Sequence, residues 1–206
     1  MQEILSISNI QKTMKRIAIF CSSNSGNNNI YKEQATLLGQ TLAKHNIEVV
    51  YGGTKIGLMG AVADGALSEG GKVIGVLPHL LKMKEIEHEH LTELIFVDSM
   101  HERKVKLNEL CDGVIALPGG FGTMDELFEM LTLAQIGLHQ KPIALLNTND
   151  FYSPLIALVQ AMVDNGFLKE VNQEMIIVSD NIDELISKMN NYIAPVEEKW
   201  IEKKPK

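Results

Sequence analysis

The sequence predicts an α/β protein: a single Rossmann-like, doubly wound domain on a mostly parallel sheet of about seven strands, with helices on both faces. Two observations lead to this fold class. Short apolar runs, such as residues 17–21 and 113–117, alternate with longer segments of helical periodicity. These runs are almost entirely apolar instead of alternating with polar residues, which is typical of parallel strands that are covered on both sides.

Strands and helices follow one another along the chain. The expected strands are residues 17–21, 47–51, 73–77, 94–97, 114–117, 142–146 and 175–178. The expected helices are residues 31–43, 58–69, 101–111, a long helix that ends near residue 136, 152–165 and 183–192. Residues 82–90 are expected to form a charged loop or a short helix. The expected organisation is an N-terminal extension (1–13), one Rossmann-like domain (14–194) and a charged C-terminal tail (195–206).

The overall composition argues against several classes of function. The chain has 206 residues and a net charge of −7, and an acidic surface repels nucleic acid and anionic membranes. No apolar stretch reaches the ~18 residues of a membrane span, and residues 1–13 lack the pattern of a signal peptide. Cys21 and Cys111 form neither a disulfide framework nor a metal-ligand pattern, so we expect both to be reduced and buried. These observations favour a cytoplasmic protein without nucleic-acid or membrane partners.

Three strand exits carry the residues expected of a ligand site. Ser22, Gly52 and Gly119 each follow the carboxyl end of an expected strand. In doubly wound sheets, ligands bind outside these ends, where the strand order reverses. The sequence therefore predicts that the three loops meet over one crevice. The glycine-rich loop of residues 52–60 is expected mainly to let a helix pack closely on its strand.

The most informative stretch is residues 117–126 (LPGGFGTMDE), which connect an apolar strand to a helix. Its three glycines leave backbone N–H groups uncovered at the positive end of the helix dipole. Pro118 directs the chain out of the strand, and Thr123 can act as N-cap or donate its hydroxyl to an anion. A tight turn without a ligand would use the same glycines for geometry alone. The pattern favours an anion site, with phosphate as the expected ligand.

Charged residues occupy the starts of two helices. Asp125 and Glu126 are expected in the first turn of the helix after the glycines, either as partners of the helix dipole or as functional acids beside the phosphate. Ser99 and Glu102 match a capping box at the start of the other helix. Arg103 and Lys104, which follow Glu102, are then positive charges at the positive end of a helix dipole, which is unfavourable. We therefore expect Glu126 or an anionic ligand to balance their charge.

Common cofactor motifs are absent from the sequence. No Gly-x-Gly-x-x-Gly follows the first strand, no acidic residue ends the second, and no Walker lysine loop occurs. The chain is therefore not expected to be an NAD enzyme or a P-loop NTPase. His88, His90 and His101 are expected to be exposed to solvent, because a His-x-His pair alone is a weak metal pattern. We expect neither a metal nor a cofactor.

Two spaced motifs resemble the signature of a known family. Residues 100–104 (MHERK) and 118–126 (PGGFGTMDE) are similar to the paired motifs of the LONELY GUY (LOG) proteins. These are cytokinin riboside 5′-monophosphate phosphoribohydrolases, often mislabelled as lysine decarboxylases. The stretches 20–23 and 51–60 also resemble family motifs, and the likeness covers nearly the whole chain.

The resemblance implies hydrolysis of the N-glycosidic bond of a nucleoside 5′-monophosphate, which yields free base and ribose 5-phosphate. It implies that Arg103 and Glu126 are the catalytic pair and that residues 14–194 form a nucleotide-binding catalytic domain. Cleavage builds positive charge on the ribose, which a carboxylate stabilises. The family also implies a homodimer. The residues assigned to substrate binding are Ser22, Glu85, Lys104, Gly119, Gly120, Phe121, Gly122, Thr123, Met124 and Asp125.

Two alternatives compete with this function. A lysine decarboxylase needs pyridoxal phosphate on a lysine in a larger fold, and no lysine in this sequence has such a setting. A non-catalytic nucleotide or molybdenum-cofactor carrier on the same fold would share the glycine-rich anion site but needs no carboxylate beside it. The Arg103 and Glu126 pair therefore favours the enzyme. The base, adenine as in AMP or an N6-prenylated adenine, is left open.

Overall fold

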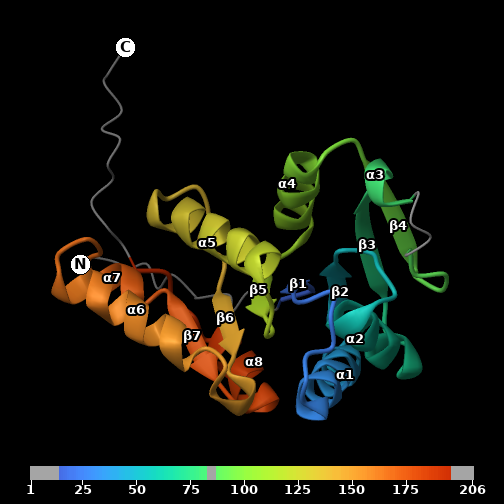
Figure 1. Ribbon diagram of the computed structural model, residues 1–206, viewed down its shortest axis with the longest axis horizontal. Coiled ribbons are helices and arrows are strands. Elements are labelled where there is room, and N and C mark those ends of the chain that lie inside the picture. The colour runs from blue at the N-terminus through green and yellow to red at the C-terminus, as the bar shows by residue number, and fades with distance from the viewer. Residues whose placement is uncertain (1–13, 83–86, 196–206) are drawn as a thin grey trace, which may run out of the picture.

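A computed structural model describes residues 14–82 and 87–195 of the protein. Within this part of the chain, seven parallel strands form one sheet in the order β4-β3-β2-β1-β5-β6-β7 (Figure 1). Each strand overlaps an expected apolar run, so the predicted sheet is confirmed. The expected extension (1–13), Glu85 and all but the first residue of the expected tail (195–206) lie outside the described residues. The strands are β1 Arg16–Phe20, β2 Glu48–Tyr51, β3 Val73–Pro78, β4 Glu93–Val97, β5 Gly113–Ala116, β6 Ile143–Leu146 and β7 Ile176–Ser179.

Helices cover both faces of the sheet (Figure 1). All six predicted helices are present, as α1, α2, α4, α5, α6 and α8. The short helices α3, η1 and α7 were not predicted. The helices are α1 Asn29–Lys44, α2 Gly57–Ser68, α3 His79–Lys82, α4 Met100–Leu110, α5 Phe121–Gln135, the 3-10 helix η1 Thr148–Asp150, α6 Ser153–Asp164, α7 Glu170–Gln173 and α8 Ile182–Asn190.

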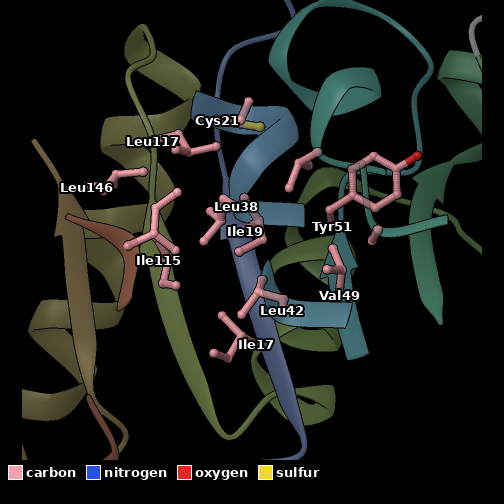
Figure 2. Close-up of a cluster of buried hydrophobic side chains, with 14 of the residues drawn as sticks. Ile17, Ile19, Cys21, Leu38, Leu42, Val49, Tyr51, Ile115, Leu117 and Leu146 are labelled. Carbon is pink, nitrogen blue, oxygen red and sulfur yellow. The ribbon is translucent and has the colours of Figure 1, made fainter. Parts of the chain in front are cut away.

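The central strand β1 divides the core into two layers. Ile17, Ile19 and Cys21 belong to the layer packed under α1, α2 and α8, part of which Figure 2 shows. Ala18 and Phe20 belong to the layer packed under α4 and α5. Successive side chains of a strand point to opposite faces, and all five residues are at most 3% exposed. Both faces of the strand are therefore buried, as its apolar sequence predicts.

The strand order reverses between β1 and β5. From β1 the sheet extends through β2 and β3 to β4, and the chain then returns to form β5, β6 and β7 on the other side of β1. In doubly wound folds, ligands bind outside the carboxyl ends of the strands at such a reversal. The candidate site is therefore the place where the residues after Phe20 and after Ala116 emerge side by side.

The structure bears out the expected state of the cysteines and contains no helix of the kind that spans a membrane among the described residues. Cys21 and Cys111 are both free and buried, as predicted. Burial raises the pKa of both thiols, so neither has the character of a reactive thiolate. Among the described residues, no helix is long and apolar enough to cross a bilayer.

Candidate active site

Three strand exits meet at the reversal between β1 and β5. The Ser22 N–H donates to the Pro118 carbonyl (3.3 Å), and the Ser22 carbonyl accepts from the Leu58 N–H in the first turn of α2 (3.1 Å). Gly57 has a φ of +60°, and a Cβ on it would lie 2.2 Å from the Ser23 carbonyl carbon. Only glycine fits such a close approach in this conformation. The predicted meeting of the loops after β1, β2 and β5 is thus confirmed.

The glycine turn after β5 leads directly into α5. Gly120 is the N-cap residue, and no side-chain hydrogen bond caps the helix within the described part of the chain. The Met124 N–H donates to the Gly120 carbonyl (3.1 Å), which is the first helical bond. The N–H groups of Phe121, Gly122 and Thr123 therefore have no helical acceptor, and they lie at the positive end of a 15-residue helix. Such a helix start can bind a phosphate.

The helix begins earlier than the sequence predicts, and three expectations change. Thr123 is not the N-cap but the third residue of α5, and it is buried against Gly119, where a Cβ would lie 2.1 Å from the Thr123 Oγ1. Asp125 and Glu126 lie in the second turn, not the first. The helix starts early because Gly120 acts as the N-cap, a position at which glycine is tolerated without a capping side chain. Dipole compensation therefore does not explain Glu126, because it falls off within the first turn.

Glu126 instead faces Arg103 of α4. The Arg103 Nη1 donates to the Glu126 Oε1 (2.7 Å), and the Arg103 Nε donates to the Val76 carbonyl (3.2 Å). The two side chains are 7% and 6% exposed. Gly52 completes the packing around the guanidinium, because a Cβ on Gly52 would lie 2.3 Å from the Arg103 Nη2. The glycine after β2 thus leaves room for the Arg103 guanidinium beside Glu126.

Burial dominates the electrostatics of this pair. Removal from water raises the pKa of the Glu126 carboxyl, while the Arg103 guanidinium opposes the rise. The pKa of the Cys21 thiol at the end of β1 is raised by burial and also by the negative charge of Glu126. A buried carboxylate that is held by one cation and has a raised pKa is suited to proton transfer or to the stabilisation of developing positive charge.

The second cation at the start of α4 is also paired with α5. The Lys104 Nζ lies 3.1 Å from the Asp125 Oδ2 and 3.3 Å from the Glu129 Oε2. The Ser99 hydroxyl accepts from the Glu102 N–H (3.1 Å), which confirms Ser99 as the N-cap. The Glu102 carboxylate accepts from the Asp98 N–H (2.9 Å). A capping box would instead use the Ser99 N–H, so the second bond of the predicted box is shifted by one residue.

The prediction that His88 is exposed is wrong. Its side chain is buried, and its Nε2 lies 3.1 Å from the Asp64 Oδ1 of α2. The His88 N–H donates to the Gly53 carbonyl (3.0 Å), and Thr54 pairs with Glu87 in an isolated antiparallel bridge. These contacts hold the chain at residues 87 and 88 against the loop after β2. The other two histidines of the predicted set are exposed, as expected.

Two buried tyrosines at the carboxyl edge of the sheet form hydrogen bonds that the sequence analysis did not predict. The Tyr51 hydroxyl donates to the Thr54 carbonyl (3.2 Å), and the Tyr152 hydroxyl donates to the Leu117 carbonyl (2.7 Å). Tyr51 ends β2, and Tyr152 follows β6 at the same edge of the sheet. A buried tyrosine needs a partner for its hydroxyl. For Tyr51, its place at the end of an apolar run was an available signal, whereas Tyr152 lies six residues beyond β6 and has no such signal in the sequence.

The structure therefore brings most of the predicted site residues to one place. Ser22 contacts the base of the glycine turn, and Arg103 and Lys104 reach α5 from the neighbouring helix α4. Phe121 is 97% exposed at the start of α5. Glu85 lies outside the described residues. Which of these residues contact a substrate stays a prediction.

Comparison with known proteins finds relatives of this chain. A family model described as "Possible lysine decarboxylase" matches residues 59–189. A cytokinin riboside 5′-monophosphate phosphoribohydrolase from Arabidopsis thaliana is 40% identical over 195 residues, which cover 95% of this chain and 91% of that protein. A probable cytokinin riboside 5′-monophosphate phosphoribohydrolase from Oryza sativa subsp. japonica is 44% identical over 177 residues, which cover 86% of this chain and 79% of that protein.

Solved structures share the fold at lower identity. The molybdenum cofactor binding protein from the phototrophic bacterium Rippkaea orientalis matches with a TM-score of 0.65 and 22% identity, over 85% of this chain and 95% of that one. At this identity the likeness extends to the fold alone. The choice between an enzyme and a carrier therefore depends on the sequence relatives and on the site.

Proposed function

Because this chain belongs to the family of possible lysine decarboxylases that includes the cytokinin riboside 5′-monophosphate phosphoribohydrolases, we propose that it is a phosphoribohydrolase. It hydrolyses the N-glycosidic bond of nucleoside 5′-monophosphates, cytokinin nucleotides and AMP among them, and releases free base and ribose 5-phosphate. The observation that carries the proposal is the buried ion pair between Arg103 of α4 and Glu126 of α5, next to the start of α5, which no side chain in the described part of the chain caps. The helix start binds the phosphate, and the pair acts on the sugar.

The helix sets the distance between phosphate and carboxylate. Glu126 follows Gly122 by four residues, so it lies one turn further along the same face of α5. Helical side chains lean toward the N-terminus of their helix, and the Glu126 carboxylate therefore points back toward the free N–H groups. A phosphate bound there places the ribose near the carboxylate. Binding energy at the phosphate is thereby used to position C1′ for reaction.

The chemistry follows from the charge that develops on the ribose. Cleavage passes through an oxocarbenium-like state, which the Glu126 carboxylate stabilises. The same carboxylate either orients and deprotonates the attacking water or attacks C1′ itself. The bond from C1′ to the base nitrogen breaks, and its electron pair leaves with the base. Water supplies the hydroxyl that ends on C1′ and the proton that the base takes up. Where Glu126 attacks C1′, water does so by hydrolysing the ester between Glu126 and the ribose. Burial raises the pKa of the Glu126 carboxyl, and Arg103 opposes this rise and so favours the ionised form. Arg103 also contacts ribose or phosphate oxygens.

Other residues of the crevice are proposed to hold the nucleotide. The free N–H groups at the start of α5 bind the phosphate, as described above. Lys104 adds a positive charge next to this helix. The remaining residues proposed to line the nucleotide are Ser22, Glu85, Gly119, Gly120, Met124 and Asp125.

The site does not suit a lysine decarboxylase. That reaction uses pyridoxal phosphate held on a lysine as an electron sink. Lys104 lies next to Arg103 on α4, but its ammonium group already contacts the carboxylates of Asp125 and Glu129. Burial lowers the pKa of Lys104, but the two carboxylates together outweigh burial and raise it overall, so the lysine stays protonated. It is therefore a poor nucleophile for a Schiff base.

A non-catalytic carrier of a nucleotide or of the molybdenum cofactor is the second candidate, supported by the fold of the Rippkaea protein. A carrier gains nothing from a carboxylate beside a bound anion, because the two charges repel. Incubation of AMP and isopentenyladenosine monophosphate with the wild type and with Glu126→Gln, followed by chromatography, separates the two functions. Free base and ribose 5-phosphate from the wild type alone support the enzyme. Intact nucleotides with binding retained in both proteins support the carrier.

We also propose that the protein is a cytoplasmic homodimer. Several large apolar side chains on α4, on α6 and in the segments after α5 and α6 are exposed, and a second copy would remove them from water. Two buried free cysteines fit a reducing compartment, and the net charge of −7 disfavours nucleic acid as a partner. Sedimentation of a monomer at micromolar concentration would contradict the dimer. The exposed residues are Val105, Ile136, Leu138, Leu158 and Phe167.

A further inference from the structure

We propose that Tyr152 is a positioning residue for the phosphate-binding turn, and that its hydrogen bond to the Leu117 carbonyl sets the affinity for the 5′-phosphate. This inference rests on the proposed function. The Tyr152 hydroxyl lies 2.7 Å from the Leu117 carbonyl oxygen. Both residues are at most 1% exposed. Leu117 stands between the end of β5 and Pro118, so the bond acts where the turn leaves the sheet.

Three hydrogen bonds hold the turn at its base. The Leu117 N–H donates to the last carbonyl of β1 (2.9 Å), and the Pro118 carbonyl accepts from the Ser22 N–H (3.3 Å). The bond from Tyr152 is the third, and it is the one that a side chain supplies. Because the first helical bond accepts at Gly120, these three contacts and the packing of Gly119 against Thr123 position the backbone before Gly120. Loss of one of them lets the turn move relative to the sheet.

Tyr152 is itself held firmly and cannot follow a moving turn. Its N–H donates to the Asn147 Oδ1 (2.7 Å), and its ring belongs to the core layer under α4 and α5. The Phe151 ring stands nearly perpendicular to it, with the ring centroids 5.1 Å apart. Burial raises the pKa of the Tyr152 hydroxyl, so the group remains a donor at neutral pH. Tyr152 thus connects the β6 exit to the β5 exit.

The effect falls on phosphate binding more than on the chemical step. The free N–H groups of residues 121–123 begin only four residues after Leu117. The Glu126 carboxylate has its own support, because Arg103 binds it and the adjacent Leu127 is fully buried in the core. Loss of the Tyr152 bond therefore displaces the phosphate donors while the Arg103–Glu126 pair stays in place. We expect the larger effect on KM and on ribose 5-phosphate affinity, and a smaller fall in kcat, because the phosphate also positions C1′.

Tyr152→Phe tests the assignment, because it removes the hydroxyl and keeps the ring. The dissociation constant of ribose 5-phosphate, measured by calorimetry, should rise roughly three- to tenfold, the range produced by loss of one buried neutral hydrogen bond. KM for AMP should rise by a similar factor, and kcat should fall by a smaller factor than KM rises. Ile143→Val is the matched control, since Ile143 is buried in the same layer. It should lower the melting temperature and leave ribose 5-phosphate binding unchanged.

The outcomes separate this role from the proposed function. An unchanged dissociation constant in Tyr152→Phe, or an equal rise in Ile143→Val, would overturn the positioning role while wild-type activity leaves the function intact. A wild type that neither cleaves AMP nor binds ribose 5-phosphate would overturn both. If Tyr152→Phe does not fold, Asn147→Ala takes its place, because it removes the acceptor of the Tyr152 N–H. Unchanged ribose 5-phosphate binding in that variant would equally overturn the role.

Discussion

Replacement of Glu126 by glutamine is the most direct test of the catalytic pair. Glutamine keeps the size of the side chain, and its amide oxygen can still accept from the Arg103 Nη1, which lies 2.7 Å from the Glu126 Oε1. The negative charge is lost from a position that is only 6% exposed, where charges are weakly screened. One well-placed electrostatic group contributes about 10²–10³ in kcat, and a general base about 10²–10⁴. We therefore expect kcat to fall by at least about 10³-fold.

The variant should nevertheless fold and bind the product. The neutral amide no longer carries the cost of a buried charge, which is the cause of the raised Glu126 pKa, but Arg103 loses its buried counter-charge. These effects oppose each other. We therefore expect the free energy of unfolding to differ from that of the wild type by no more than about 1–2 kcal/mol, which corresponds to about 2–8 °C in Tm for a chain of this size. Ribose 5-phosphate should bind at least as tightly, because its phosphate contacts backbone N–H groups and a repelling carboxylate is gone.

The assay measures free base released from saturating AMP by chromatography, together with calorimetry of ribose 5-phosphate. Glu129→Gln is the matched control, because Glu129 lies on the same helix and forms an ion pair with Lys104 (3.3 Å) away from Arg103. The control should keep kcat within about threefold of the wild type. A kcat for Glu126→Gln within about tenfold of the wild type, or an equal loss in both variants, would refute the catalytic role of Glu126.

Four further outcomes are expected. Because burial raises the pKa of the Glu126 carboxyl above its usual 4.5, kcat/KM should fall as pH falls through a midpoint above that value, and a midpoint below it would contradict the assignment. The same raised pKa stabilises the fold below the unfolded-state pKa of about 4.5 and ceases to do so as pH rises through the folded-state pKa. The stability of the wild type relative to Glu126→Gln, measured by urea unfolding, should therefore decline as pH rises above that unfolded-state value, and a rise instead would contradict the shift. Gly52→Ala would place a Cβ 2.3 Å from the Arg103 Nη2 and displace the guanidinium. We therefore expect kcat to drop about 10²-fold, while the affinity for ribose 5-phosphate is retained. An unchanged kcat would show that catalysis does not depend on the position of the guanidinium. In Gly119→Ala the new Cβ would lie 2.1 Å from the Thr123 hydroxyl, so the free energy of unfolding should fall by about 1–3 kcal/mol. In Gly122→Ala the new Cβ meets open space, so the free energy of unfolding should rise by up to about 1 kcal/mol. Equal free energies for the two variants in urea unfolding would contradict this packing.

The fold could be predicted where its signals are local in sequence. The strand β5 and the turn before α5 are visible because an apolar run, a proline and three glycines follow one another within eleven residues, 113–123. The short helices α3 and α7 were missed, because a single turn has little stability of its own and depends on its surroundings. The start of α5 was placed too late. A search for a capping side chain selects Thr123, whereas the helix begins after a glycine.

The site could be predicted only in part, because its contacts are not local. The sequence indicated that the cations of α4 need a counter-charge, but the choice of acid depends on how the sheet places α4 against α5. Arg103 then reaches Glu126, 23 residues away. The burial of His88 depends on Asp64 of α2 in the same way, and the charged loop around His88 has no periodicity that could show it. Tyr152 lies 35 residues from Leu117, so only the parallel pairing of β5 with β6 brings them together.

The cost of the Arg103–Glu126 pair is itself an argument for catalysis. Breaking up such a buried pair in favour of apolar side chains often leaves a fold equally stable, and the carboxylate repels any anion at the start of α5. A protein that only carried a nucleotide would lose nothing without Glu126, whereas an enzyme that builds positive charge on ribose recovers the cost in the transition state. An iminoribitol 5-phosphate, which carries that positive charge in its ring, should therefore bind the wild type at least about 10²-fold more tightly than ribose 5-phosphate does. Glu126→Gln should lose most of this preference in calorimetry, and equal affinity of the wild type for both ligands would contradict charge stabilisation by Glu126.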